Sequence, residues 1–406
     1  MENAPAAPYV GHEAAQPIRN VRTKESAMKK TRTLALAALI VFGSALSPLS
    51  GSSAADDRNE DPLAARIDAL LAKAYPADKP GAVSLVVKDG KMLFQKAYGL
   101  ADLEFGVPMT PKTVFACGSM TKMFTATAVM MLAEARSLRY DDPISKYLPE
   151  APSAWAGITV DHVLSHTSGL LDLFKIPEWM AQWKEEISPE ALIAFFKDKP
   201  LQFEPGTKAE YSNSNYAVLG QIVEHVSGKP LEQFVNERII RPLDLKATRF
   251  AIGLEEIVPL RAKPYLIYPD GSLKHPPFMI PWSQAYGAGT VHSTVGDIAK
   301  FVAALFDGTL LKPESLVHVT TPRTMKDGTP SPYGYGNLFV FAEGTAPIIR
   351  ISGSTIGTEV YLLYLKDEKA LVAVFSNVAT YLPRAGNPYF PGPLVKEIAL
   401  MLVEKR

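Results

Sequence analysis

The sequence predicts a fold of the α/β class, of the α+β type, in which one antiparallel sheet is built from the N- and C-terminal segments and flanked by helices. Three observations predict it. Strand-like segments lie near both ends of the chain, the region from about 120 to 300 is mainly helical in pattern, and residues 62–406 contain no internal repeat. We therefore expect a single domain over 62–406 into which the helical region is inserted.

The N-terminal residues have the pattern of a secretory signal peptide over 28–55. A basic head precedes an apolar run over 34–42, and small residues follow it. The run is too short for a confident transmembrane helix, so we expect a periplasmic or secreted bacterial protein with no stable membrane insertion after cleavage. Because signal peptides normally begin at the initiator, we expect residues 1–27 to be a spurious extension before a start at Met28.

A helix and a hairpin are the first elements expected after the signal peptide. The amphipathic pattern of residues 61–76 predicts a helix ended by Pro76. Residues 81–99 contain two apolar runs joined through Asp89 and Gly90, a dipeptide typical of a tight hairpin turn. This hairpin is the N-terminal contribution to the sheet.

The C-terminal part returns to strands. Strand patterns cover 335–343, 346–353 and 358–377, and the last of these is a hairpin with Asp367 and Glu368 in its turn. Residues 392–405 close the chain as a helix. We expect these strands to share one sheet with the N-terminal hairpin.

The composition excludes several kinds of partner. The 406 residues are 47% hydrophobic and 21% charged, which is enough apolar surface for a large core. Lysine plus arginine balance aspartate plus glutamate at 42 each, which argues against nucleic acid or an anionic membrane surface. The single cysteine, Cys117, cannot form an internal disulfide, and we expect it to be a small buried residue.

Ser119 and Lys122 are the first candidate catalytic pair. They lie one turn apart at the start of a helix predicted from Met120 onward, so the amine can reach the hydroxyl. The helix N-terminus and apolar neighbours should lower the pKa of Lys122 and make it a general base for Ser119, whose backbone N–H would help to hold an oxyanion. The alternative is that Ser119 only caps the helix, but such a cap favours Glu or Gln at the position of Lys122.

Tyr211 and Asn213 form a second polar motif directly before a predicted helix. In an extended segment, residues two apart point the same way, so both side chains could face one cleft. The alternative is that Asn213 or Ser214 only caps the helix. The S-x-x-K pattern, the Y-x-N pattern and a glycine-bearing strand near the C-terminus are much rarer together than separately.

With these motifs the sequence resembles the serine β-lactamase and penicillin-binding-protein superfamily, closest to its branch of class C β-lactamases, D-alanyl-D-alanine carboxypeptidases and family VIII esterases. The resemblance runs from about residue 62 to the end and is also carried by residues 164–170, 204–220, 241–250 and 287–301. It implies a β-lactamase/transpeptidase-like fold and an acyl-enzyme hydrolase with no cofactor. In that hydrolase Ser119 is the nucleophile, Lys122 its base and Tyr211 a proton shuttle toward the leaving group. Asn213 would bind the acyl-side amide or carbonyl.

The third motif of the family, K-T-G, H-x-G or W-x-G, corresponds to Ile351-Ser352-Gly353 followed by Ser354, and here the sequence departs from the pattern. The glycine remains where substrate must approach the strand closely, and the N–H of Ser354 remains available as a second oxyanion donor. The cation is replaced by Ile351. Arg350 should not substitute for it, because neighbouring strand residues face opposite sides.

The replacement of the third motif's Lys or His by Ile351 predicts the class of substrate. In the family that Lys or His helps to bind a substrate carboxylate or to tune the serine and tyrosine. We therefore expect small uncharged esters, amides or peptides, with only weak β-lactamase or D,D-peptidase activity. One alternative is a β-lactamase or D-alanyl-D-alanine carboxypeptidase proper, in which a basic residue of 261–274 supplies the charge. Another is a non-catalytic binding protein of the same fold.

A metal site is not expected. His162 and His166 are four residues apart, a spacing compatible with one helical face. However, Val163 stands where a zinc protease of the HExxH type carries its glutamate, and the sequence offers no evident third ligand. We expect His166 to hold the loop at the end of a helix instead.

Overall fold

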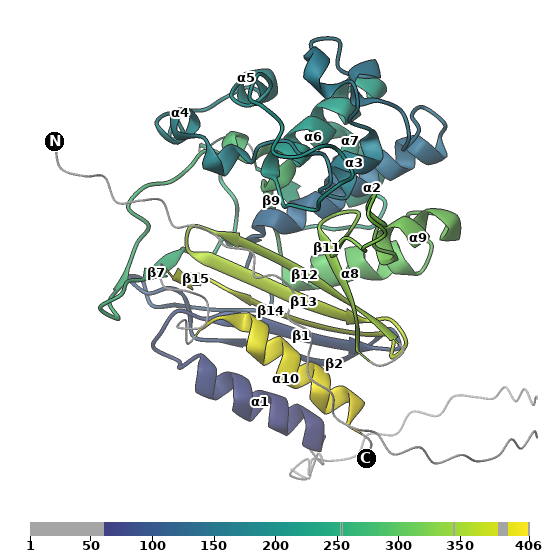
Figure 1. The fold of residues 1–406 in the computed structure, drawn as a ribbon. Coiled ribbons are helices and arrows are strands. Elements are labelled where there is room, and N and C mark those ends of the chain that lie inside the picture. Colours follow the sequence, from purple (N-terminus) through teal and green to yellow (C-terminus); the bar gives the residue numbers. More distant parts are fainter. Residues whose placement is uncertain (1–60, 252, 254, 344–345, 381–388, 405–406) are drawn as a thin grey trace, which may run out of the picture.

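The computed structural model describes residues 61–251, 253, 255–343, 346–380 and 389–404, and Figure 1 shows their arrangement. The expected signal peptide over 28–55 and residues 1–27 lie outside the described residues. Within the described ranges, no helix is both long enough and apolar enough to span a membrane.

A seven-stranded antiparallel sheet joins the two ends of the chain, as the sequence predicts. Its strand order is β10-β11-β12-β13-β14-β1-β2. The strands are β1 (Ala82–Lys88), β2 (Lys91–Tyr98), β10 (Tyr333–Gly334), β11 (Leu338–Glu343), β12 (Ala346–Thr355), β13 (Thr358–Leu365) and β14 (Ala370–Ser376). β1 pairs with β14 along its whole length, so the N-terminal hairpin joins the C-terminal strands within one sheet, with β2 at its edge.

The two hairpin turns that the sequence predicts lie in this sheet. Asp89 and Gly90 have φ angles of 50° and 72°, which is the geometry that an Asp-Gly pair adopts in a two-residue hairpin. Asp367 and Glu368 lie in the turn between β13 and β14. Both predicted hairpins are therefore confirmed.

The first and last helices cover one face of the sheet (Figure 1). They are α1 (Pro62–Ala74) and α10 (Pro391–Val403), close to the bounds that the sequence predicts. Ile67 and Ile398 are fully buried and pack with Val372 and Val374 of β14 in a separate hydrophobic core. β14 is thus apolar on both of its faces, because helices cover both faces of the sheet.

The helical region lies over the opposite face of the sheet (Figure 1). Its helices are α2 (Thr121–Glu134), α3 (Val160–Leu164), α4 (Pro177–Met180), α5 (Pro189–Ala194), α6 (Asn213–Ser227), α7 (Leu231–Val235), α8 (Val295–Phe306) and α9 (Pro313–Thr320). α2 packs against α6, while α8 packs on β1 and β14. Phe124 of α2 stacks on Phe301 of α8 with ring centroids 4.1 Å apart. α2 is therefore a central buried helix, and it carries Lys122 into the core.

The expectation of a mainly helical region between about 120 and 300 is correct in outline but misses four short strands. They are β6 (Arg249–Phe250), β7 (Tyr265–Ile267), β8 (Leu273–Lys274) and β9 (Val291–Ser293). Strands this short show no alternation in the sequence. β9 pairs with β5 (Phe115–Ala116) immediately before Ser119, so one of the missed strands helps to position the candidate nucleophile.

Asn377 ties the end of β14 to two other segments. Its side chain is fully buried. Oδ1 accepts from the N–H of Gly81 at 2.8 Å, and Nδ2 donates to the carbonyls of Lys263, Leu100 and Ala101 at 3.0 to 3.3 Å. One buried amide thus links backbone groups of three segments that are far apart in the chain.

We expect Asn377→Ala to lower the free energy of unfolding by roughly 2–4 kcal/mol, because buried backbone groups lose their partner. Urea denaturation of the purified protein measures this change. The control is Asn236→Ala, at a half-exposed residue directly after α7. It should change the free energy of unfolding by less than about 1 kcal/mol. Equal stability of the two variants would contradict the structural role of Asn377.

Candidate active site

Ser119 lies in a short 3-10 turn, Gly118–Met120, that leads from β5 into α2. The alternative, that Ser119 only caps the long helix, is wrong, since α2 begins at Thr121 and its N-cap position is Met120. Gly118 has a φ of 50°, and this left-handed residue turns the chain sharply before the helix begins. The half-buried hydroxyl of Ser119 instead lies 2.8 Å from the hydroxyl of Tyr211.

Lys122 is fully buried and donates three hydrogen bonds. Its Nζ lies 3.3 Å from Ser119 Oγ, 2.9 Å from Asn213 Oδ1 and 3.0 Å from the carbonyl oxygen of Ala288. Loss of hydration lowers the pKa of Lys122 to about 7, as the sequence predicts, although the charge of Asp172 acts in the opposite direction. The amine therefore changes its protonation state near neutral pH.

Tyr211 and Asn213 meet Ser119 and Lys122 at one point. Between them Ser212 is extended, with φ −146° and ψ 127°, so both side chains face the same way, as predicted. Tyr211 donates from its hydroxyl to Asn213 Oδ1 at 3.1 Å. Burial holds the pKa of Tyr211 well above its usual value, so the phenol is protonated at neutral pH.

Asn213 is engaged at both ends of its amide. Oδ1 accepts from Lys122 and Tyr211, and Nδ2 donates to Asp172 Oδ1 at 3.2 Å. That Asn213 binds the acyl-side carbonyl or amide of a substrate stays a prediction. In this structure its amide oxygen holds the lysine and the tyrosine together.

β12 runs against the turn that carries Ser119. A Cβ on Gly353 would lie 1.9 Å from the carbonyl oxygen of Cys117 and 3.0 Å from the nitrogen of Ser119. A Cβ on Gly118 would lie 2.5 Å from the carbonyl oxygen of Ser354. Two glycines therefore allow strand and turn to touch, and the crossing brings the backbone of Ser354 beside that of Ser119. Cys117 is fully buried beneath this crossing, as expected.

Ile351 and Arg350 lie on opposite faces of β12, as the sequence predicts. The side chain of Ile351 is 1% exposed and belongs to the main hydrophobic core. The guanidinium of Arg350 lies over the ring of Phe339, 3.9 Å from its centroid. β11 pairs with β12 only as far as Arg350, so the segment from Ile351 to Ser354 extends beyond β11 toward the Ser119 turn. Ile351 thus contributes no charge at this edge, and Ser352 is also buried.

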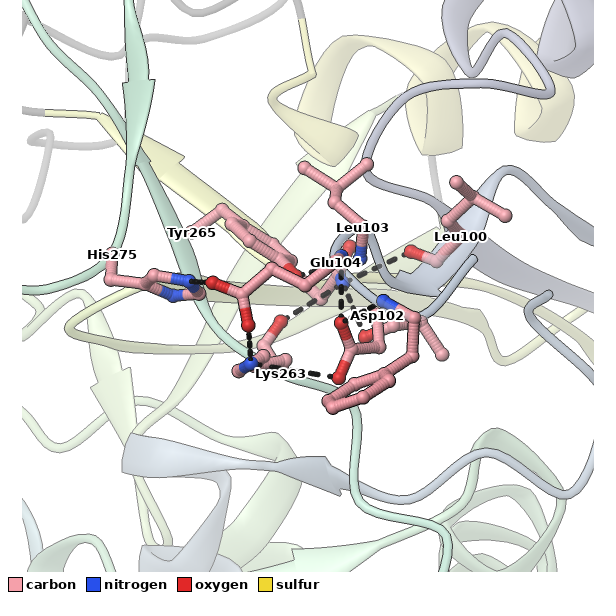
Figure 2. Close-up of polar contacts among 10 residues, drawn as sticks. Leu100, Asp102, Leu103, Glu104, Lys263, Tyr265 and His275 are labelled. Atoms are coloured by element: carbon pink, nitrogen blue, oxygen red, sulfur yellow. Dashed lines mark hydrogen bonds and ion pairs between the residues drawn. The ribbon is translucent and has the colours of Figure 1, made fainter. Parts of the chain in front are cut away.

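The segment 261–274 was the alternative source of a cation, and Figure 2 shows that its lysine at position 263 is already paired. Lys263 contacts Glu104 and lies 3.6 Å from Asp102, while His275 Nε2 lies 2.7 Å from Glu104. The Nζ of Lys274 lies over the ring of Tyr268. The ammonium of Lys263 is therefore paired with two carboxylates, one at the end of β3 (Leu100–Asp102) and one just after it.

His162 and His166 have separate partners. His162 Nδ1 accepts from the N–H of Thr159 and completes the N-terminal cap of α3. His166 Nδ1 accepts from the N–H of Ser212 at 3.2 Å, and its ring lies 4.8 Å from that of Tyr211. Among the described residues, no group of three or more His, Cys, Asp or Glu side chains could hold a metal ion. His166 thus ties the loop after α3 to the tyrosine segment, as predicted.

Sequence reasoning missed one residue of this site, Asp172. It precedes the short 3-10 helix Leu173–Lys175 and accepts from both the backbone N–H and the side-chain amide of Asn213. No motif marked it, because its partner lies 41 residues away in the chain. Its position close behind the stretch 164–170 is the only signal in the sequence.

The fold and this group of side chains define a class of protein, the serine hydrolases of the β-lactamase and penicillin-binding-protein fold. A sequence model of the family described as Beta-lactamase matches residues 64–389, and the chain belongs to this family. PbpX of Bacillus subtilis, named for the penicillin-binding proteins, is 32% identical over 295 residues, which are 73% of this chain and 70% of PbpX. The predicted resemblance is therefore confirmed.

Two further relatives carry names of enzymes. Esterase EstB of Burkholderia gladioli is 29% identical over 292 residues, covering 63% of this chain and 73% of EstB. The crystal structure of D-amino acid amidase from Ochrobactrum anthropi SV3 matches with a TM-score of 0.70 at 25% identity, over 85% of this chain and 98% of the amidase.

We expect Gly353→Ala to lower the free energy of unfolding by roughly 1–3 kcal/mol, because the added methyl group overlaps the carbonyl of Cys117. Denaturant unfolding measures the loss. Gly157→Ala is the matched control, since a Cβ there meets no atom within 4 Å. A Gly353→Ala protein as stable as the control would mean that β12 and the Ser119 turn are not in contact.

Proposed function

We propose that the protein hydrolyses uncharged esters or amides through an acyl-enzyme, with Ser119 as nucleophile, Lys122 as general base and Tyr211 as proton shuttle. One observation carries this proposal. The hydroxyl of Ser119 lies within 3.3 Å of both a buried amine whose pKa is about 7 and a phenol that stays protonated. A nucleophile, a base and a relay are thus in hydrogen-bonding contact before substrate arrives.

The hydrogen bonds of Lys122 support its role as base. A neutral amine has two N–H donors and one lone pair. Asn213 Oδ1 and the carbonyl of Ala288 accept the two donors, which leaves the lone pair for the proton of Ser119. As that proton moves to Nζ, Oγ attacks the carbonyl carbon, and the charge develops on the carbonyl oxygen.

The remaining steps follow from the same contacts. The backbone N–H groups of Ser119 and Ser354 would stabilise the oxyanion. The proton taken by Lys122 passes through Tyr211 to the leaving group, and the neutral phenol accepts and donates without acquiring a charge. Water then attacks the acyl-enzyme by the reverse path, with the same base, and releases the acid and Ser119.

Uncharged substrates are proposed because Ile351, a core residue, stands where the family carries a cation. Lys263 is paired with carboxylates, and Arg350 lies on the other face of the strand. Two relatives, an esterase and a D-amino acid amidase by name, support ester or amide bonds as the target. The signal-peptide pattern over 28–55 supports action in the periplasm or outside the cell. A non-catalytic binding protein is disfavoured by the intact contact between Ser119 and Lys122.

We expect Ser119→Ala, Lys122→Ala and the double variant to fall to the same low rate, about 10²- to 10⁴-fold below the wild type, because residues that act as one unit are not additive. Hydrolysis of short-chain nitrophenyl esters and labelling by a fluorophosphonate probe measure this. Lys112→Ala, at an exposed lysine before the turn, should keep the wild-type rate. Wild-type activity in Lys122→Ala would refute the base assignment.

We expect the wild type to prefer a neutral ester over a cephalosporin or a D-alanyl-D-alanine peptide by at least about tenfold, the equivalent of roughly 1.4 kcal/mol. A carboxylate buried beside Ile351 loses water and gains no charged partner. Ile351→His should narrow this preference, whereas Ile351→Val should leave it unchanged. Comparable kcat/KM values of the wild type for both kinds of substrate would contradict the prediction.

A further inference from the structure

Asp172 is a buried carboxylate to which the catalytic steps above give no part. Its side chain is 9% exposed. Oδ1 accepts from the backbone N–H of Asn213 at 3.0 Å, from its Nδ2 at 3.2 Å and from the N–H of Phe174 at 3.4 Å. Oδ2 lies 3.5 Å from the same Nδ2. A carboxylate with this set of donors is held firmly at the base of the site.

These contacts decide which way the amide of Asn213 points. An ionised carboxylate can only accept, so the NH₂ end of the amide must face Asp172. The oxygen of the amide must then face the other way, where it accepts from Lys122 at 2.9 Å and from Tyr211 at 3.1 Å. A reversed amide would present N–H groups to two donors and would leave the carboxylate facing an oxygen.

Burial raises the pKa of Asp172, whereas hydrogen bonds from Asn213 and Phe174 and the charge of Lys122 act against that rise. In its ionised form the carboxylate also places a negative charge behind the lysine. The groups that face Lys122 are the hydroxyl of Ser119 from the 3-10 turn, the carbonyl of Ala288, the amide of Asn213, the rings of Tyr211 and Tyr216, and the charge of Asp172. His166 adjoins Tyr211 from the loop after α3. Of these groups, Asp172 is the carboxylate. Its charge raises the pKa of Lys122 against the larger effect of burial, which lowers it.

We propose that Asp172 is a positioning residue of the catalytic centre: it orients the amide of Asn213 toward Lys122 and Tyr211, and its charge sets the pH range in which Lys122 is a free base. This inference rests on the proposed function, since it takes Lys122 as the base. It assigns one carboxylate two separable effects, one from its acceptor geometry and one from its charge.

The variant Asp172→Asn separates the two effects. The three shorter hydrogen bonds all end on Oδ1, and an asparagine can keep that oxygen while losing the charge. We expect the acid limb of kcat/KM against pH, measured with a neutral nitrophenyl ester, to move to lower pH by about one unit, because Lys122 then loses its proton more readily. Asp172→Ser also removes the charge and should move the limb in the same direction, with a larger fall in kcat.

Asp172→Glu tests the geometry, since it keeps the charge but displaces the acceptor. We expect its acid limb to stay at the wild-type pH while kcat falls more than KM changes. Glu210→Gln is the matched control, because this carboxylate adjoins Tyr211 but is paired with Lys175 and Lys208. Its pH profile should be that of the wild type.

Two results would overturn the assignment of Asp172. One is that the acid limb does not move in Asp172→Asn and Asp172→Ser. The other is that the pH profile of Asp172→Glu shifts as far as the profiles of these two neutral variants. A purely structural cap would lower the melting temperature of all three variants and leave every profile in place. Failure of the proposed function is distinguishable, because the wild type would then show no hydrolysis that depends on Ser119. If the wild type is active but the acid limb of Asp172→Asn does not move, only the proposed role of Asp172 is rejected.

Discussion

The amine of Lys122 has no contact with solvent, and the rest of the site is arranged around that fact. A buried ammonium is costly, so desolvation favours the neutral amine and brings its pKa to about 7. The polar neighbours of Lys122 provide the hydrogen bonds that a buried amine needs. Asn213 and Ala288 supply acceptors, Ser119 supplies a hydroxyl, and the charge of Asp172 raises the pKa of the amine against the effect of burial.

The fold delivers these groups from segments that are distant in the chain. α2 carries Lys122 inward from one side, α6 begins at Asn213 on another, and β12 closes the third side against the Ser119 turn. The closest approach is between Gly353 and Cys117, where no side chain could fit. The sheet that supports β12 needs both ends of the chain, since β14 pairs with β1. The geometry of the site therefore depends on the pairing of β1 with β14.

The same architecture separates catalysis from the recognition of charge. The polar groups around Lys122 lie on the helical side, whereas the cation that the family carries on the strand beside the site is replaced by Ile351 in the core. Lys263, one candidate for supplying that charge, lies beside two carboxylates (Figure 2). A site built in this way can activate a serine without attracting a carboxylate. This division is the physical basis of the proposed preference for uncharged substrates.

The sequence by itself determined the strands at both ends, the Asp89-Gly90 turn, the long helix after Ser119 and the residue types of the S-x-x-K and Y-x-N motifs, because periodicity and turn chemistry are local. It placed Ser119 at the start of the long helix, where the structure has a 3-10 turn, and it missed β6 to β9, whose two or three residues carry no pattern. It also missed Asp172, whose contacts orient the amide of Asn213. Only the tertiary structure decided these points, since burial, pKa and the orientation of an amide depend on groups that chain folding brings together from far apart in the sequence.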